Sequence, residues 1–157
     1  MTIIDKNLEF ADATSVGTPN NTTVNVGNVI DLGGAGRNVG DGEPMYFCVE
    51  VTTTIGSGGA ATVSFLLSSD SSETLAVDGN QTIHYESDVF ALATVVAGFR
   101  LVVPLPWGNP GVNEYERYLG FQVRENAGQA LNAGAVNAYI TKNPRGWKAY
   151  PQGSITG

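Results

Sequence analysis

The sequence predicts an all-β protein: an antiparallel sandwich of two sheets, with about eight strands and little helix. Three observations support this fold class. Short segments alternate between apolar and polar residues, as expected of strands with one buried face. Gly, Asn, Asp, Ser and Pro separate these segments and mark turns. No window longer than about ten residues has the periodicity of a helix.

The clearest predicted strand covers residues 45–54. Met45, Phe47, Val49 and Val51 fall on one face of this strand, and the residues between them fall on the other. Because the face that carries Phe47 is uniformly apolar, we expect it to lie in the core. The polar face is expected to point away from it.

The remaining segments divide the chain into an N-terminal extended arm (1–12), one sandwich domain (13–142) and an irregular C-terminal tail (143–157). Inside the domain, 14–27 is expected to be a loop with one short strand. The apolar run at 89–96 is compatible with either a buried strand or two turns of helix. The other strands are predicted at 28–32, 61–68, 82–86, 98–103, 118–125 and 136–140.

The connections indicate how these strands are arranged. They are too short for helical crossovers, so the sheets must be antiparallel. Loops of unequal length disfavour an up-and-down barrel and favour a jelly roll, the simplest eight-stranded double sheet. An immunoglobulin-like sandwich is the alternative, although the chain lacks its Cys–Trp–Cys framework. The predicted core consists of Phe47, Val49, Val51, Val63, Phe65, Leu101, Val103, Leu119, Phe121, Val123, Val136, Ala138 and Ile140.

The composition of the chain disfavours several classes of function. The 157 residues include 8 Lys+Arg against 15 Asp+Glu, a net charge of −7, which disfavours binding to nucleic acid or to anionic membranes. Only 15% of residues are charged, as suits a surface that a partner covers. There is no apolar run of the roughly 18 residues needed for a membrane helix. The N-terminus does not resemble a signal peptide, so we expect synthesis in the cytosol.

No set of reactive residues stands out, so we predict a protein without enzymatic activity, metal or cofactor. The Gly-rich segment 33–42 leads into Pro44 and a strand, whereas a phosphate-binding loop needs a helix at that point. The acidic loop residues match no calcium-loop spacing. Cys48 is the only cysteine and is expected to be a buried core residue. His84 lies mid-strand without a nucleophile signature and is expected to be solvated or at an interface.

The two ends of the chain and its two tryptophans are unusually apolar for exposed segments. We predict that at least one end contacts a neighbouring subunit or another partner, and the alternative is that both ends pack on their own domain. Tryptophans in Pro/Gly-rich loops are expected to dock rather than to stay exposed, although a carbohydrate-binding platform is the other interpretation. The predicted interface residues are Ile3, Ile4, Leu8, Phe10, Trp107, Trp147, Tyr150 and Pro151.

Several segments, in order along most of the chain, share one further pattern. They are Ile3–Lys6, Leu8–Ala13, Asn28–Gly33, Arg37–Pro44, Leu66–Asp70, Arg117–Leu119 and Tyr150–Gly153. Together they resemble the jelly-roll cement, or capsid-stabilising, proteins of short-tailed bacteriophages. The Gly-Asp-Gly-Glu-Pro run at 40–44 carries most of this resemblance, and segments 107–116 and 143–148 depart from the family pattern.

The resemblance implies a structural virion protein, not an enzyme. Such a protein binds the outer surface of the capsid and bridges neighbouring major capsid protein subunits against the pressure of packaged DNA. The expected partners are therefore the major capsid protein and further copies of the chain, as a homotrimer or a homodimer. The expected location is the capsid exterior, after assembly in the host cytoplasm. A carbohydrate- or receptor-binding β-sandwich module of a phage particle is the alternative.

Overall fold

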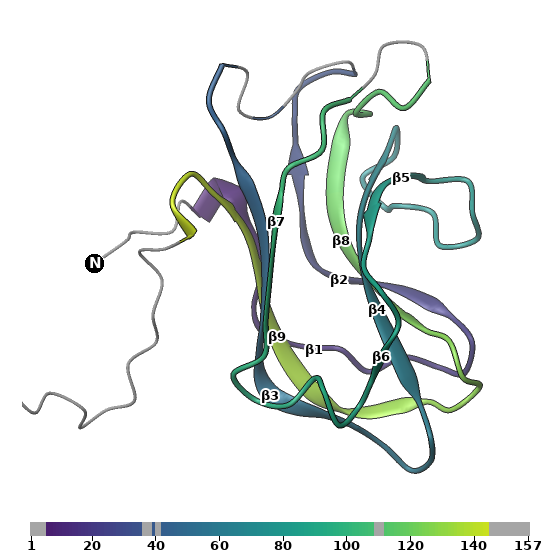
Figure 1. Cartoon of the computed structure of the whole chain (residues 1–157). Coiled ribbons are helices and arrows are strands. Elements are labelled where there is room, and N and C mark those ends of the chain that lie inside the picture. Colours follow the sequence, from purple (N-terminus) through teal and green to yellow (C-terminus); the bar gives the residue numbers. More distant parts are fainter. Residues whose placement is uncertain (1–5, 36–38, 40–41, 109–111, 145–157) are drawn as a thin grey trace, which may run out of the picture.

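The computed structural model describes residues 6–35, 39, 42–108 and 112–144. Within these residues the chain forms one short 3-10 helix and nine strands, so the predicted all-β fold is confirmed (Figure 1). The elements are η1 (Lys6–Leu8), β1 (Glu9–Ser15), β2 (Thr23–Asp31), β3 (Tyr46–Ser57), β4 (Thr62–Asp70), β5 (Thr82–Glu86), β6 (Phe90–Ala91), β7 (Arg100–Pro104), β8 (Tyr118–Glu125) and β9 (Leu131–Thr141).

The strands pair into two antiparallel sheets that face each other. The first sheet has the order β1-β9-β3-β7 and the second the order β2-β8-β4-β5, with β6 beside β4. The antiparallel pairs β1/β9, β2/β8, β3/β7 and β4/β5 thus alternate between the two sheets. This alternation is the jelly-roll connectivity, in which an antiparallel ribbon wraps around the core.

Aromatic side chains from both sheets fill the centre of the sandwich. The ring of Phe121 lies 6.0 Å from that of Phe47 and 6.2 Å from that of Phe65. All the predicted core residues are buried except Leu101 and Val103, which are half-buried against the core. Both of these belong to β7, a strand at the edge of its sheet, so their side chains are covered on one side only.

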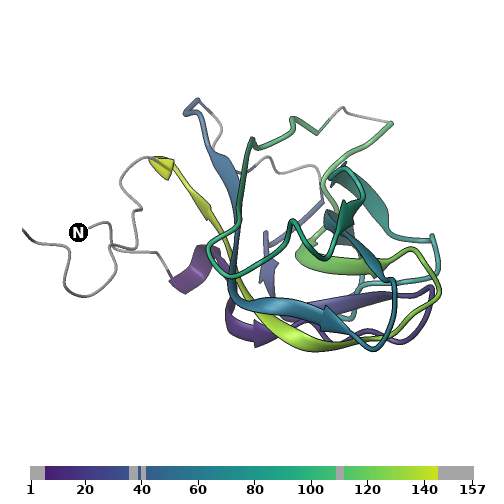
Figure 2. The ribbon, with the colours of Figure 1, turned by 60° about the horizontal axis from the view of Figure 1, so that its bottom comes forward.

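Strands β1 and β2 close one side of the sandwich. Gly27 in β2 has a φ of 78°, and a Cβ atom there would lie 1.9 Å from the carbonyl oxygen of Phe10 in β1. The two backbones therefore approach as closely as glycine allows. The long strands β3 and β9 curve toward the second sheet at their lower ends, where their pairing shifts register (Figure 2).

Part of the predicted N-terminal arm lies within the sandwich. Residues 9–12, expected in the extended arm, belong to β1, and Phe10 is fully buried. Strict alternation is lost in β1 because its pairing with β9 shifts register twice and Ala13 has a φ of 46°. The segment 89–96 is neither a full strand nor a helix: Phe90 and Ala91 form β6, and a turn follows.

The loop between β4 and β5 covers the outer face of the second sheet. Gln122 in β8 is fully buried and its amide donates hydrogen bonds of 2.8 Å to the Ala76 carbonyl and to Asn25 Oδ1. Leu75 lies directly over Gly120, where a Cβ would come within 2.7 Å of the leucine side chain. The chain itself thus occupies this face.

In the described part of the chain, no helix has the length and hydropathy needed to cross a bilayer.

The close approach at Gly27 gives a test of the closed side. We expect Gly27→Ala to lower the free energy of unfolding by about 2–4 kcal/mol, because a positive φ and a backbone overlap both act against the methyl group. Gly79→Ala is the matched control, since Gly79 has a φ of 101° and no atom lies within 4 Å of the position that a Cβ would take. Its cost should be about 1–2 kcal/mol. Urea unfolding of both variants measures the difference, and equal costs would contradict the close approach.

Candidate functional site

The predicted interface residues have very different positions. Ile3, Ile4, Trp147, Tyr150 and Pro151 lie outside the described residues. Of the others, Leu8 is half-buried against the core, Phe10 is buried and Trp107 is 70% exposed.

The prediction of Phe10 as an interface residue was wrong. Its ring lies 6.1 Å from that of Phe47 in an edge-to-face arrangement, inside the sandwich. Since its side chain has no exposed surface, it cannot contact a partner of the folded domain. Of the predicted interface residues that the structure describes, Trp107 is the one that is largely exposed.

Trp107 stands at the mouth of an apolar pocket of about 370 Å³. Proline rings and aliphatic side chains form most of the wall, and the pocket lies where β3 begins and β7 ends. Its lining residues are Val39, Gly42, Glu43, Pro44, Met45, Tyr46, Pro104, Leu105, Pro106 and Trp107. The single carboxylate of the lining, Glu43, is paired with Lys142 at the rim. The interior of the pocket is thus suited to an apolar group.

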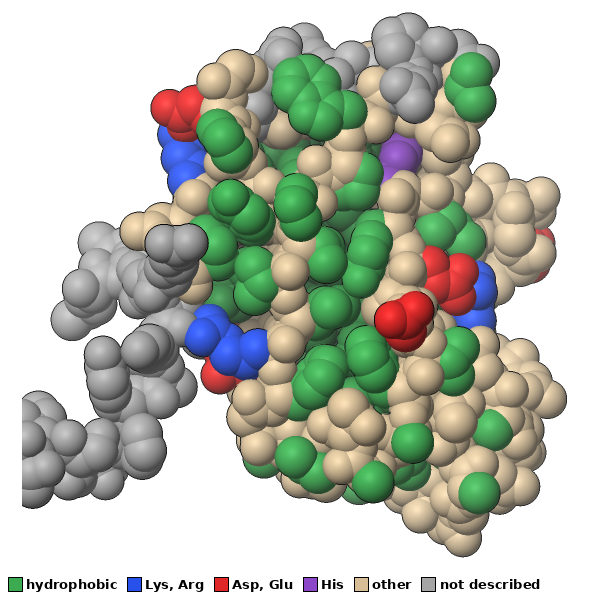
Figure 3. Space-filling view, viewed as in Figure 1, with side chains coloured by type: hydrophobic (Ala, Val, Ile, Leu, Met, Phe, Trp, Pro, Cys, Tyr) green, Lys and Arg blue, Asp and Glu red, His purple; other side chains and the backbone are tan. Residues whose placement is uncertain are grey.

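The pocket continues into the side of the sandwich opposite β1 and β2. We call this side the open edge: it consists of β7 on the first sheet and of β5 and β6 on the second. Figure 3 shows hydrophobic side chains in a band along this face. The partly buried hydrophobic residues on these strands and on the β6–β7 connection are Tyr85, Phe90, Leu92, Phe99, Leu101 and Val103. The core side chains at the open edge are therefore only partly covered by other residues of the chain.

Aromatic contacts hold the open edge in place from within. The ring of Phe90 in β6 lies 5.1 Å from that of Phe99, just before β7, and so joins the two sheets. Tyr85 in β5 approaches Phe47 of the first sheet at 6.3 Å. These contacts fix the floor of the edge, so the exposed apolar surface is preformed.

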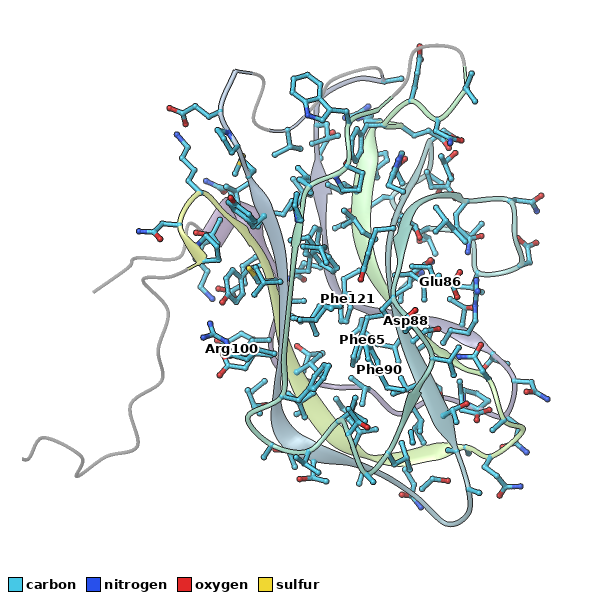
Figure 4. The ribbon with its side chains drawn as sticks, in the orientation of Figure 1. Phe65, Glu86, Asp88, Phe90, Arg100 and Phe121 are labelled. Atoms are coloured by element: carbon cyan, nitrogen blue, oxygen red, sulfur yellow. The ribbon has the colours of Figure 1, made fainter. Side chains whose placement is uncertain are left out.

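The open edge carries one exposed acidic group, Asp88, that lacks an ion-pair partner among the described residues. Figure 4 shows Asp88 near Phe65 and Phe90, whereas Glu86 lies against Ser64 on the outer face of the second sheet. Glu86 pairs there with Arg124 at 2.6 Å.

Arg100 lies on the opposite side of the first sheet from these phenylalanines (Figure 4). It neighbours Cys48 there and does not neutralise Asp88. Asp88 instead acts on Tyr85: burial and, second, this carboxylate raise the pKa of the tyrosine.

Ser69 and His84 form a contact below the open edge, and this contact has a structural role, not a catalytic one. Ser69 Oγ is 2.7 Å from His84 Nε2 and accepts a hydrogen bond from the backbone N–H of Glu116. Burial of the ring lowers the pKa of His84 to about 4, so the imidazole is neutral at pH 7. Tyr115 stacks on the imidazole at 4.0 Å. Ser69 has no exposed surface, so a substrate cannot reach its hydroxyl.

His84 is thus half-buried and stacked within its own domain, which differs from the solvated or interface histidine that the sequence suggested. Cys48 is buried as predicted, and burial raises the pKa of its thiol to about 11, so it is unreactive at neutral pH. Among the described residues, no group of three or more His, Cys, Asp or Glu side chains is arranged to hold a metal ion.

Comparison with known proteins places the chain in a family. A family model described as Bbp16 matches residues 10–140, which is well over half of the chain. The chain belongs to the Bbp16 family. This membership points to a phage-associated protein. No curated protein matches the chain.

The sequence predicted Trp107 as an interface residue but did not indicate the rest of the open edge. Leu101 and Val103 were assigned to the core because they alternate correctly, and alternation does not reveal that a strand lies at an edge. Two signals were available: Pro104 and Pro106 favour an edge strand, and the apolar run at 89–96 lacks the alternation of a half-buried strand.

The buried imidazole predicts a pH-dependent stability. Burial lowers the pKa of His84 from 6.5 to about 4, so the unfolded chain binds a proton that the folded chain does not between these values. Stability should therefore fall as the pH drops from 6.5 to 4, by roughly 1–2 kcal/mol after allowing for partial exposure of the ring. We expect His84→Gln to lose this part of the pH dependence. Urea unfolding of both proteins at pH 7 and pH 4.5 tests it, and identical pH profiles would contradict it.

Proposed function

We propose that the protein is a capsid cement protein, which binds the outside of a phage capsid and bridges major capsid protein subunits. The observation that carries this proposal is the exposed Trp107 at an apolar pocket that continues into the open edge. An exposed aromatic beside a preformed apolar surface is typical of a protein–protein contact. Membership of the Bbp16 family and the resemblance to phage cement proteins support the same assignment.

Charge and chemistry are consistent with this role. A net charge of −7 on the outside of a shell avoids competition with the capsid protein for the packaged genome. The one Ser–His contact is inaccessible, so a hydrolytic function lacks support from the described residues. A small rigid sandwich that presents one preformed surface suits a clamp between subunits.

We further propose that the protein forms a closed homo-oligomer on the capsid, a trimer or a dimer, because shells offer sites of local three-fold and two-fold symmetry. Contacts between copies are assigned to the ends of the chain. The predicted residues there, Ile3, Ile4, Trp147, Tyr150 and Pro151, lie outside the described part of the chain. Light scattering that shows a monomer, in solution and on the shell, would contradict this proposal.

Carbohydrate binding is the second candidate, and one observation favours it. A 70% exposed tryptophan beside proline rings is a surface on which a sugar ring can stack. In that case the protein would serve as a receptor-binding module of a phage particle.

One experiment separates the two functions. Purified protein is mixed with capsids assembled without it and is also applied to a glycan array. We expect saturable, stoichiometric binding to the capsids and an increase in the temperature at which they disrupt, because a ligand that binds only the assembled state stabilises it. Retention on glycans together with no binding to capsids would contradict the cement function and support the carbohydrate-binding one.

A further inference from the structure

We propose that the open edge is the surface that docks on the capsid, and that its occupant is a segment of the major capsid protein that carries apolar side chains next to a lysine or arginine. This inference rests on the proposed function and adds which surface makes the contact and what chemistry it recognises. The relevant surface comprises Trp107 with its pocket, the half-buried residues of β5, β6 and β7, and Asp88.

The other large apolar surfaces of the described chain are already covered. Strands β1 and β2 close the opposite side, with Gly27 against Phe10. The loop over β4 and β8 covers the outer face of the second sheet, with Leu75 against Gly120. On the outer face of the first sheet, Cys48 and Tyr139 are buried, and Val102 beside Cys48 is the exposed apolar residue. The open edge is where Trp107 and Val89 remain exposed together with half-buried core residues.

Backbone geometry argues against an occupant that extends the sheet. The Leu105 N–H donates to the Met45 carbonyl, and Val51 pairs with Phe99, so the odd-numbered residues of this stretch direct their backbone groups at β3. Pro104 therefore faces the open side, where it has no N–H to offer. With only five residues and a proline at its end, β7 is a poor template for another strand. Docking along β7 therefore relies on side chains.

Charge argues against a second copy as the occupant. A two-fold contact through this edge would bring two Asp88 carboxylates into one interface. The nearby cations are already engaged: Arg124 pairs with Glu86, and Lys142 pairs with Glu43. Two chains of net charge −7 would also repel each other.

A partner that brings a lysine or arginine to the interface avoids this repulsion between negative charges. Asp88 lies on the rim beside Tyr85, so a lysine or arginine that reaches it would be flanked by apolar neighbours that bury against β5–β7. Charge pairs at an interface rim mainly set the association rate and the salt dependence. The apolar anchor, Trp107, is expected to contribute most of the affinity.

The test uses the full chain and capsids assembled without it, with binding measured by co-sedimentation at low and high salt. We expect Trp107→Ala to weaken binding by about tenfold or more. Asp88→Lys should weaken it by about tenfold at low salt, with the loss reduced at high salt because ions screen the charge. The controls are Val77→Ala, an exposed valine on the loop over the second sheet, and Asp12→Lys, the same charge change on edge strand β1. Both should bind within twofold of wild type.

A second measurement identifies the occupant directly. A photo-crosslinking residue at position 107, with position 77 as the control, is irradiated on decorated capsids and the linked peptide is sequenced by mass spectrometry. We expect a capsid-protein peptide with apolar residues next to a lysine or arginine. A covalent dimer of this chain crosslinked through position 107 would identify a second copy as the occupant and overturn the inference.

The remaining outcomes also separate the two proposals. If wild type binds capsids and both Trp107→Ala and Asp88→Lys bind equally well, the inference fails while the cement function stands. If wild type does not bind capsids, the cement function fails, and the inference fails with it. Circular dichroism and thermal melting confirm that each variant is folded, and both substituted side chains are exposed, so misfolding is not expected to confuse the result.

Discussion

The packing of Phe47, Phe65 and Phe121 between the two sheets is the contact on which the rest of the structure depends. One of these rings comes from each of the central strands β3, β4 and β8, and all three are fully buried. A chain with a single cysteine has no internal disulfide and depends on such a centre, because burial of each phenylalanine side chain contributes about 1.5–3 kcal/mol. The three rings set the separation of the sheets, and that separation decides how the sheet edges meet.

The two sides of the sandwich cover the core to different extents. On one side, glycine lets the backbones of β1 and β2 approach until the core is sealed. On the other side, β7 faces only the short strands β5 and β6, and side chains of the core reach the surface. Phe90 and Phe99 join the sheets at the base of this side without covering it. The open edge is thus a consequence of short strands, not a separate structure added to the fold.

The sequence predicted correctly those strands in which apolar and polar residues alternate regularly. The central strands and their buried faces were predicted correctly, because Phe47, Phe65 and Phe121 each sit in a regular apolar/polar pattern with turn residues on both sides. Strand β1 was missed because two register shifts and the positive φ of Ala13 break its pattern. Its burial depends on the pairing with β9, more than a hundred residues later in the chain, which no local pattern contains.

The candidate site was harder to predict for a related reason. Trp107 stood out because tryptophan is rare and lies between proline and glycine. Leu101 and Val103 were indistinguishable from core residues, since alternation reports which way a side chain points and not whether a second sheet covers it. Sheet order made the difference, and sheet order is a property of the whole fold.

An exposed apolar edge promotes aggregation, and several features of the chain limit this tendency. Unpaired edge strands with apolar neighbours promote aggregation when another strand can add to them. Here the edge strand β7 is short, ends at Pro104 and continues into Pro106, so its backbone offers little to an incoming strand. Across the open edge from β7, the carboxylate of Asp88 disfavours a symmetric contact between copies. The side chains of the open edge therefore stay available to a partner of complementary charge, while the backbone of β7 offers little to a strand from another copy.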